Sequence, residues 1–532
     1  MASHIRGRLS TEPANIEDIL TDIERGEVKI PKFQRPFVWR VDQALNLLDS
    51  LASGYPVGSV LLWRTTEKLR AERNIGDFSL PETDDMTPTK YVLDGQQRLT
   101  VMYSSFGAKP DDPGFAPLYD LEAESFVVNP NQREVHQFPL RLTYRTTELL
   151  NYRTALQALE KHQTYQERLD QLIGAITGYR LPVVELRDLT VSEVCPIFER
   201  INSSGTKLST FDLIAAATWT QEFDLSDQAS EIAVAIAPKG FDGLSNETTL
   251  KCISAASIGS VKKEDVLTLR TKPKDEIIEA TESVKSAMLL AVDFLATEFR
   301  VTSMAFVPYE AQLIALVTIF AEVRDLNPEQ LTRVRQWFWR SSFSQHYRGA
   351  SEAFVTRSLL EVSAWVKDGS GSASQFGEAP TGEQVANESF HFRGATSKAL
   401  VLALAKNNPR NLTSGSAVDV GEALSVYNKR QFHHIYPQAY LKRAGTDENI
   451  NSFANICMLS AQENNRISDI DPNVYLPRAV QELGEDCEPV FGSAFMPPAP
   501  HFDYSANAYP EFVTARAALL AEHFRHLCDG EL

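Results

Sequence analysis

Apolar residues recur at two different periods along the chain. Ile16, Leu20 and Ile23 are three or four residues apart, which predicts a helix with one apolar face. Gly26 follows where a helix C′ glycine is expected. Residues 57–63 form a nearly continuous apolar run, which predicts a buried strand. The first part of the chain is therefore expected to mix helices and strands.

Later segments differ in their periodicity. Residues 275–366 carry apolar positions at the helical period and predict a helical subdomain. The following stretch is rich in Gly, Ser and polar residues without apolar periodicity, which is typical of a flexible linker. We therefore predict four segments, namely an N-terminal domain at 1–270, a helical subdomain at 271–366, a linker at 367–389 and a C-terminal α/β domain at 390–532.

Composition narrows the class of protein. A chain of 532 residues is too long for one core. Its formal net charge of −18 argues against a protein that coats nucleic acid, because Lys and Arg supply most non-specific affinity. Its five cysteines never form a C-x-x-C pair, which favours a reducing compartment. No apolar run reaches the length of a membrane span, and no signal-peptide core is present, so a cytoplasmic protein is expected.

Two adjacent histidines are the first candidates for chemistry. His433 and His434 fall in a predicted strand, so their side chains should point to opposite faces. A neutral imidazole can take a proton from water while a divalent cation stabilises charge on a phosphate. The charged residues between 426 and 445 are all cations, namely Lys429, Arg430, Lys442 and Arg443. From spacing alone, a structural histidine pair flanked by solvated lysines is the alternative.

A proline-rich segment near the N-terminus carries cations, an amide and aromatic residues. Pro31 and Pro36 disfavour a helix over residues 30–39. Gln34 and Arg35 lie between them, and such groups can bind phosphate or pack against a base. A loop that anchors itself in the core through aromatic plugs fits the pattern equally well.

The turn Asp94-Gly95-Gln96-Gln97-Arg98 follows an apolar strand and precedes a helical pattern. Free backbone amides, a glycine, an arginine and a carboxylate at one turn suit a phosphate or nucleotide. Asp94 could hold a metal or orient a water molecule. No P-loop pattern is present. An ordinary helix start without a ligand is the alternative.

The C-terminal motifs resemble a nuclease core. His434-Ile435-x-Pro437, with Asn455 and Asn465-Arg466 downstream, is similar to the ββα-metal core of HNH endonucleases, and HHIYP resembles the GmrD-like half of GmrSD-type restriction enzymes. This resemblance implies that His434 is the general base and Asn455 braces the loop. It implies His433 and Asn465 as metal ligands. Many HNH enzymes have Asp where His433 stands, so Mn, Ni or Zn could replace Mg.

Four N-terminal motifs, FQRPFVW, GYPVGSVLLW, YVLDGQQRLT and FERINSSGTKLS, resemble ordered landmarks of the GmrS-like, ParB-related domain. The resemblance implies nucleotide hydrolysis and sensing of modified DNA. Asn202 and Gly205 are weaker candidates from the last motif. The resemblance assigns roles in catalysis or in nucleotide and DNA binding to Gln34, Arg35, Asp94, Gly95, Gln96, Gln97 and Arg98, with Lys429, Arg430 and Arg466 in the C-terminal part.

Together these observations predict an α+β multidomain protein with a ParB-like α/β N-terminal domain, a helical middle subdomain and a C-terminal ββα-metal (HNH) nuclease domain. The expected function is modification-dependent DNA cleavage in anti-phage defence. The expected partners are double-stranded, modified phage DNA and a nucleotide (GTP, ATP or CTP), with a homodimer as one expected assembly. A nucleotide-responsive DNA-binding regulator or scaffold subunit with an inactive nuclease half is the alternative.

Overall fold

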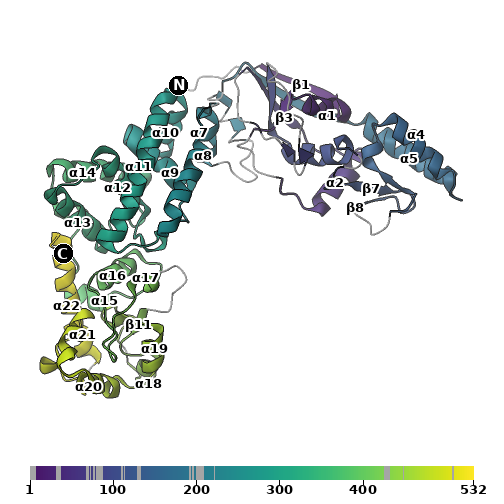
Figure 1. Cartoon of the computed structure of the whole chain (residues 1–532). Helices are drawn as coiled ribbons and strands as arrows, with labels where there is room; N and C mark the ends of the chain where they lie inside the picture. Colours follow the sequence, from purple (N-terminus) through teal and green to yellow (C-terminus); the bar gives the residue numbers. More distant parts are fainter. Residues whose placement is uncertain are drawn as a thin grey trace. The chain divides into compact units, whose positions relative to one another are not determined.

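The computed structural model divides into two compact units, Met1–Leu225 and Ser226–Leu532. Figure 1 shows their helices and strands, and each unit is considered by itself. The residues described are 8–31, 37–66, 71, 74–75, 78–79, 88–109, 112, 114–128, 133–190, 193–194, 197–198, 200, 209–220, 222–424, 432–446, 448–505 and 509–531.

The first unit is built on a mixed sheet whose strand order is β1-β10-β3-β6-β2. β1 is antiparallel to β10, β10 is parallel to β3, β3 is antiparallel to β6, and β6 is parallel to β2. Val60–Trp63 of β3 are all buried, as the apolar run predicts. The strands are β1 (Arg8–Asn15), β2 (Val28–Lys29), β3 (Val60–Thr65), β6 (Thr89–Asp94) and β10 (Arg180–Arg187).

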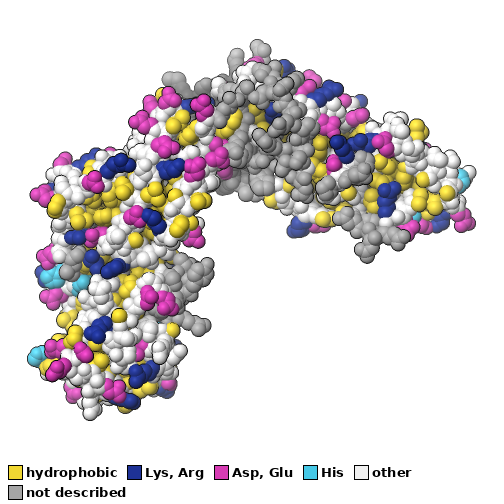
Figure 2. All heavy atoms as spheres, in the orientation of Figure 1, with side chains coloured by type: hydrophobic (Ala, Val, Ile, Leu, Met, Phe, Trp, Pro, Cys, Tyr) yellow, Lys and Arg dark blue, Asp and Glu magenta, His cyan; other side chains and the backbone are white. Residues whose placement is uncertain are grey.

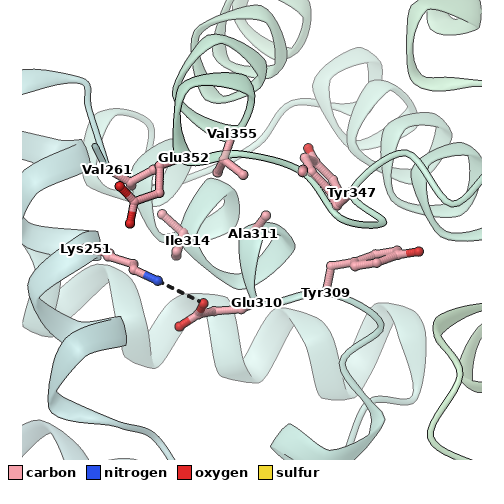
Figure 3. Close-up of a pocket in the computed structure, with 10 residues that line it drawn as sticks. Lys251, Val261, Tyr309, Glu310, Ala311, Ile314, Tyr347, Glu352 and Val355 are labelled. Atoms are coloured by element: carbon pink, nitrogen blue, oxygen red, sulfur yellow. Dashed lines mark hydrogen bonds and ion pairs between the residues drawn. The ribbon is translucent and has the colours of Figure 1, made fainter. Parts of the chain in front are cut away.

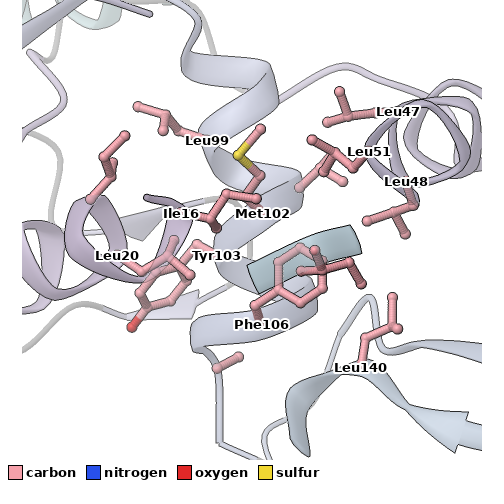
Figure 4. Close-up of a cluster of buried hydrophobic side chains, with 14 of the residues drawn as sticks. Ile16, Leu20, Leu47, Leu48, Leu51, Leu99, Met102, Tyr103, Phe106 and Leu140 are labelled. Carbon is pink, nitrogen blue, oxygen red and sulfur yellow. The ribbon is translucent and has the colours of Figure 1, made fainter. Parts of the chain in front are cut away.

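Three helices bury their apolar faces in one cluster of this unit. They are α1 (Ile16–Glu24), α2 (Val41–Ala52) and α3 (Gln96–Met102). Leu99 and Met102 of α3 lie between Leu20 of α1 and Leu51 of α2 (Figure 4). The predicted first helix is confirmed. Gly26 follows it with φ of 75°, in the left-handed region that glycine adopts at low cost.

Smaller elements complete the first unit. A second sheet has the order β8-β7-β9, and β4 pairs with β5. Ser209 and Asp212 form the predicted capping box at the start of α7. These elements are β4 (Asn74–Ile75), β5 (Phe78–Ser79), η1 (Tyr103–Gly107), β7 (Pro117–Asp120), β8 (Ser125–Val128), β9 (Gln137–Pro139), η2 (Leu140–Leu142), α4 (Thr146–Leu156), α5 (His162–Gly178) and α7 (Thr210–Thr218).

The second unit begins with a helical part. Its helical character over 275–366 is confirmed, but the helices begin earlier, within residues assigned from the sequence to the N-terminal domain at 1–270. The elements are α8 (Leu225–Ile236), η4 (Ala237–Lys239), α9 (Asn246–Ile258), α10 (Lys263–Val266), η5 (Leu267–Thr271), α11 (Lys274–Phe299), η6 (Met304–Phe306), α12 (Glu310–Glu322), α13 (Pro328–Phe343) and α14 (Glu352–Asp368).

The prediction of a flexible linker at 367–389 does not match the structure. This segment contains the end of α14, a 3-10 turn η7 (Ala373–Phe376) and helix α15 (Gly382–Asn387). Phe376 and Val385 are buried, and Thr381 caps α15. Polar composition masked isolated apolar anchors, because single buried side chains leave no periodic signal.

The rest of the second unit surrounds a two-stranded sheet, β11 with β12. α15 packs closely on α22, where an added Cβ at Gly382 would lie 3.6 Å from Cα of Ala518. The elements are α16 (Ala395–Lys406), α17 (Val420–Ala423), β11 (Phe432–His434), α18 (Gln438–Ala444), η8 (Phe453–Asn455), β12 (Ile456–Met458), α19 (Ala461–Ile467), α20 (Pro472–Leu483), η9 (Gly484–Asp486), α21 (Cys487–Ser493), η10 (Ala499–His501) and α22 (Tyr509–Asp529).

Charged side chains are spread over the surface and the described cysteines lie in the core, as the composition predicts. Cations and acidic side chains are interspersed on the face shown in Figure 2. Four cysteines are free and buried, as expected for small core residues, whereas Cys195 lies outside the described residues. They are Cys252, Cys457, Cys487 and Cys528. No helix within the described ranges is long and apolar enough to cross a membrane.

One partly buried histidine, His523, should make the second unit sensitive to acid. Burial lowers the pKa of His523 on α22 to about 4, with smaller contributions from His526 and Lys406, while the Ala403 carbonyl opposes the shift. In the unfolded state His523 therefore becomes protonated below about pH 6.5, whereas in the folded state it becomes protonated only below about pH 4. Its contribution to stability is complete above the unfolded pKa and falls as the pH drops through this window.

We expect His523→Phe, which keeps the ring contact with Phe495, to lose less stability than the wild type between pH 7 and pH 5, by about 1–2 kcal/mol. Urea unfolding followed by circular dichroism at the two pH values measures this difference. His501→Gln, at an exposed residue, is the control. Equal losses in the wild type and His523→Phe would contradict the assignment.

Candidate functional site

The two histidines lie on β11, one strand of a two-stranded sheet whose other strand, β12, is followed by a helix. β11 pairs antiparallel with β12, with His433 opposite Cys457 and His434 opposite Ile456. Two residues separate the end of β12 from the start of helix α19. Neighbouring residues of a strand face opposite sides, so His433 and His434 serve different surroundings. Along the chain the elements run β11, α18, η8, β12 and α19, so a helix and a 3-10 turn separate the two paired strands.

Asn455 holds the loop that leaves β11. Its side chain is fully buried. Its Oδ1 accepts from the Tyr436 amide at 2.8 Å, and its Nδ2 donates to the carbonyls of Tyr436 and Ile450 at 3.1 and 3.0 Å. The Ile435 amide donates to the Asn455 carbonyl at 2.9 Å. Asn455 thus braces the loop, and these contacts are structural.

A buried arginine supports this brace from behind. Arg516 of α22 is fully buried, and its Nη1 donates to the Ala454 carbonyl at 2.7 Å. Its Nε and Nη2 donate to the Ala494 carbonyl at 3.1 and 2.8 Å. Burial lowers the pKa of Arg516 to about 10, which leaves it charged at neutral pH. The guanidinium therefore ties α22 and the end of α21 to the residue before Asn455.

His434 is partly buried between α18 and the segment before η8. Its Nε2 lies 3.0 Å from Oδ1 of Asn451 and 3.1 Å from Nε2 of Gln438. Burial lowers the pKa of His434, and the Asn451 hydrogen bond opposes that shift. The imidazole is therefore neutral at neutral pH and can accept a proton.

The predicted metal ligands are less clearly gathered. His433 is partly buried on β11, whereas Asn465 is exposed on α19. Glu463 and Ile467 are the buried residues of α19, and Asn465 lies about 200° around the helix from Glu463. Across the described part of the chain, no group of three His, Cys, Asp or Glu side chains could hold a metal ion. An imidazole and an amide suit a divalent cation whose other ligands are water or phosphate oxygens.

The basic residues predicted around the histidines are only partly described. Lys429 and Arg430 lie outside the described residues. Arg466 is exposed on α19, and Lys442 and Arg443 occupy the last turn of α18. Arg443 Nη1 lies 2.7 Å from Oδ2 of Asp469. The exposed cations near the histidines are therefore partly neutralised.

In the first unit, Arg98 donates hydrogen bonds to neighbouring groups of the same unit. Its Nη1 donates to the Val57 carbonyl at 3.1 Å, and its Nη2 to the Ser59 carbonyl at 2.8 Å. Nη2 also contacts Oδ2 of Asp94 at 3.0 Å. Gly58 has φ of +84°, and a Cβ there would lie 2.5 Å from Nη1 of Arg98. Arg98 therefore fixes the 57–59 segment against the DGQQR turn, a role that spacing did not predict.

The rest of this turn is compact. Gly95, with φ of 97°, precedes α3, and a Cβ there would lie 3.1 Å from Val60. Gln97 accepts from the Val38 amide at 2.9 Å, which places the turn beside the residues that follow the proline-rich segment. Gln96 is buried, and its Oε1 has no hydrogen-bond partner within the described ranges. Asp94 is half-buried.

Several predicted residues fall outside the description. Gln34 and Arg35 belong to segment 32–36, and Asn202 and Gly205 to segment 201–208; both segments lie outside the described residues. The contacts on either side, at Val38 and Ser209, are described. The structure thus brings together Asp94, Gln97 and Arg98, and separately His434 and Asn455.

The first part of the chain is similar to a known protein family. Residues 16–219 match the family model described as the N-terminal domain of the GmrSD restriction endonuclease. This part is GmrSD-like. An uncharacterized protein of Methanocaldococcus jannaschii, MJ0686, is 22% identical over 537 residues, a match that covers 89% of this chain and 88% of that protein. The resemblance of the N-terminal motifs to GmrSD-type enzymes is thereby confirmed.

The second unit contains a cavity of about 250 Å³, bordered by α9, α12 and α14. None of the residues that line it belongs to the matched range 16–219. Lys251 pairs with Glu310 at 3.2 Å. Figure 3 shows this pair and Glu352 on one side and Tyr309 with Tyr347 on the other. No predicted site residue lines this cavity.

Sequence reasoning missed three residues near His434. Gln438 and Asn451 contact its ring, and Arg516 supports Asn455. Gln438 is four residues from His434, so the HHIYPQ string could have suggested it. Asn451 and Arg516 carry no local signal, because distant segments place them there.

The two asparagines predicted at the site should differ in their effect on stability. Asn455→Ala leaves the buried Tyr436 amide and two carbonyls without partners, and we expect it to lower the free energy of unfolding by about 2–4 kcal/mol. Asn465→Ala, at an exposed position, should change it by less than about 0.5 kcal/mol. Urea unfolding of both variants measures the difference, and equal effects would contradict the brace.

Proposed function

We propose that this protein is a restriction-type DNA endonuclease whose C-terminal ββα unit hydrolyses phosphodiester bonds. The observation that carries the proposal is the placement of the partly buried His434 at the end of β11, which pairs with β12, before a loop that Asn455 braces. The match of residues 16–219 to the GmrSD restriction endonuclease N-terminal domain supports the same class of activity. DNA is therefore the proposed substrate.

In this proposal His434 removes a proton from a water molecule. The water oxygen attacks phosphorus, and the bond to the leaving sugar oxygen breaks. Asn455 keeps the His434 loop in one geometry, which lowers the cost of reaching the reactive arrangement. His433 and Asn465 are the proposed cation ligands, and a divalent cation there would supply charge stabilisation at the phosphate.

The proposed role of the first unit is regulation by a nucleotide and by modified DNA. Asp94 and the buried Gln96 and Gln97 form a compact turn beside residues that follow the proline-rich segment. The carboxylate of Asp94 is half-buried and already paired with Arg98. We propose that Asp94 orients water or a cation at a nucleotide, while Arg98 keeps the turn in shape.

Removing the proposed base should abolish DNA cleavage. We expect His434→Ala to lower the rate by about 10²–10⁴-fold, the usual contribution of general base catalysis, while nucleotide turnover persists. The assay compares plain and modified phage genomes with Mg²⁺ or Mn²⁺, with and without GTP, ATP or CTP. His501→Gln, at an exposed histidine, is the control.

Cleavage by His434→Ala at the wild-type rate would contradict the assignment. Absence of cleavage by the wild-type chain under every condition would favour the alternative, a nucleotide-responsive DNA-binding regulator or scaffold subunit. Among the described residues, no group of three His, Cys, Asp or Glu side chains could hold a metal ion, and this observation favours the alternative.

Changes in the DGQQR turn should affect nucleotide turnover. We expect Asp94→Ala to lower hydrolysis at least about tenfold, because a preorganised charge at the reacting groups is lost. Phosphate release measures this rate. Asp170→Ala, which removes an exposed carboxylate paired with Arg153, is the control. If Asp94→Ala retains full turnover and regulated cleavage, the turn is only structural.

A further inference from the structure

Three polar atoms meet in a tight triangle at the end of β11. Nε2 of His434 lies 3.0 Å from Oδ1 of Asn451 and 3.1 Å from Nε2 of Gln438. The third side, from Gln438 Nε2 to Asn451 Oδ1, is 2.7 Å. Gln438 is the first residue of α18, and Asn451 precedes η8. Segments on both sides of the loop thus converge on one ring nitrogen.

The three contacts cannot all be hydrogen bonds with a neutral ring. The Gln438 amide nitrogen carries two hydrogens and only donates, and the Asn451 oxygen only accepts. If His434 carries its proton on Nε2, it donates to Asn451 and opposes Gln438. If the proton is on Nδ1, Nε2 accepts from Gln438 but faces the Asn451 oxygen without a proton. The two amides therefore favour opposite tautomers of His434.

Hydrogen bonds hold the backbone of Asn451 in place. This favours the hydrogen bond from His434 Nε2–H to the Asn451 oxygen over the one from Gln438 to Nε2. The Asn451 amide donates to Oδ1 of Asn449 at 3.1 Å, and its carbonyl accepts from the Phe390 amide at 2.8 Å. Asn449 is in turn bonded to Asn387 at 3.0 Å and to the Tyr509 hydroxyl at 2.8 Å. The Asn451 acceptor is thus positioned by α22 and by the segment after α15.

The Gln438 amide can donate to Asn451 and does not need to donate to the His434 ring. Its 2.7 Å contact with Asn451 is the shortest side of the triangle. The other ring nitrogen, Nδ1 of His434, accepts no hydrogen bond from the described residues and is not among their buried polar atoms that lack a partner. A base acting through Nδ1 therefore meets no competing donor among the residues that the structure describes.

We propose that Asn451 is a positioning residue that holds His434 in the Nε2–H tautomer, so that Nδ1 is the nitrogen that accepts the proton. Gln438 donates to Asn451, orients its oxygen and stands as the competing donor for Nε2. The catalytic consequence rests on the proposed function, whereas the tautomer assignment does not. A wrong tautomer would direct the free electron pair toward Gln438 instead of toward water.

The test uses the full chain, without added metal, labelled with ¹⁵N-histidine. Ring ¹⁵N shifts report which nitrogen carries the proton, and loss of signals in His434→Ala assigns this residue. We expect the Nε2–H form in the wild type and in Gln438→Ala. In Asn451→Ala, Gln438 is left as the partner of Nε2, and the ring should shift to the Nδ1–H form. Asn451→Asp keeps an acceptor and should retain the Nε2–H form.

Cleavage provides the second readout. We expect Asn451→Ala to lower kcat by about 10–100-fold with little change in KM, and Asn451→Asp to recover most of the loss. The backbone bonds of Asn451 do not involve its side chain, so an unchanged melting temperature confirms folding. An Asn451→Ala ring that stays in the Nε2–H form overturns the proposal. Absence of cleavage by the wild type overturns the proposed function, while the tautomer measurement still decides the positioning role.

Discussion

One buried amide, the side chain of Asn455, holds the geometry around His434. Its oxygen and nitrogen bond the backbone on both sides of the loop that leaves β11. Away from water, each of these bonds is strong and each unpaired group would be costly. The loop therefore has one favourable path, and the position of the ring follows from it. Arg516 extends this constraint to α22, which begins more than fifty residues after Asn455.

In the first unit, too, side chains that bond loop backbone groups fix irregular segments, and here the side chains are arginines. Arg98 donates to two loop carbonyls, and the buried Arg141 donates to the carbonyls of Ser104, Lys109 and Phe115. Irregular segments leave backbone carbonyls without ladder partners. A guanidinium carries five donors and can satisfy several at once. Arginines that a sequence motif would assign to phosphate can therefore belong to the scaffold.

The support for function differs between the two units. In the first, it comes from likeness to a restriction endonuclease domain over residues 16–219. In the second, it comes from the arrangement of a two-stranded sheet, a helix and a partly buried imidazole whose pKa is lowered by burial. These lines of support are independent, because the matched residues end before the second unit begins. They meet only in the proposal that one unit regulates cleavage by the other.

Local patterns in the sequence determined much of the secondary structure. The periodic apolar residues of α1, the apolar run of β3 and the Ser209 cap were predicted, since helix faces, strands and caps depend on neighbours within a few residues. The candidate histidines and the Asn455 brace were also found from motifs. Only the tertiary structure decided that Arg98 serves its own chain, that 367–389 is packed, and that Gln438 and Asn451 meet at His434. Those outcomes depend on contacts between distant segments, which spacing along the chain does not encode.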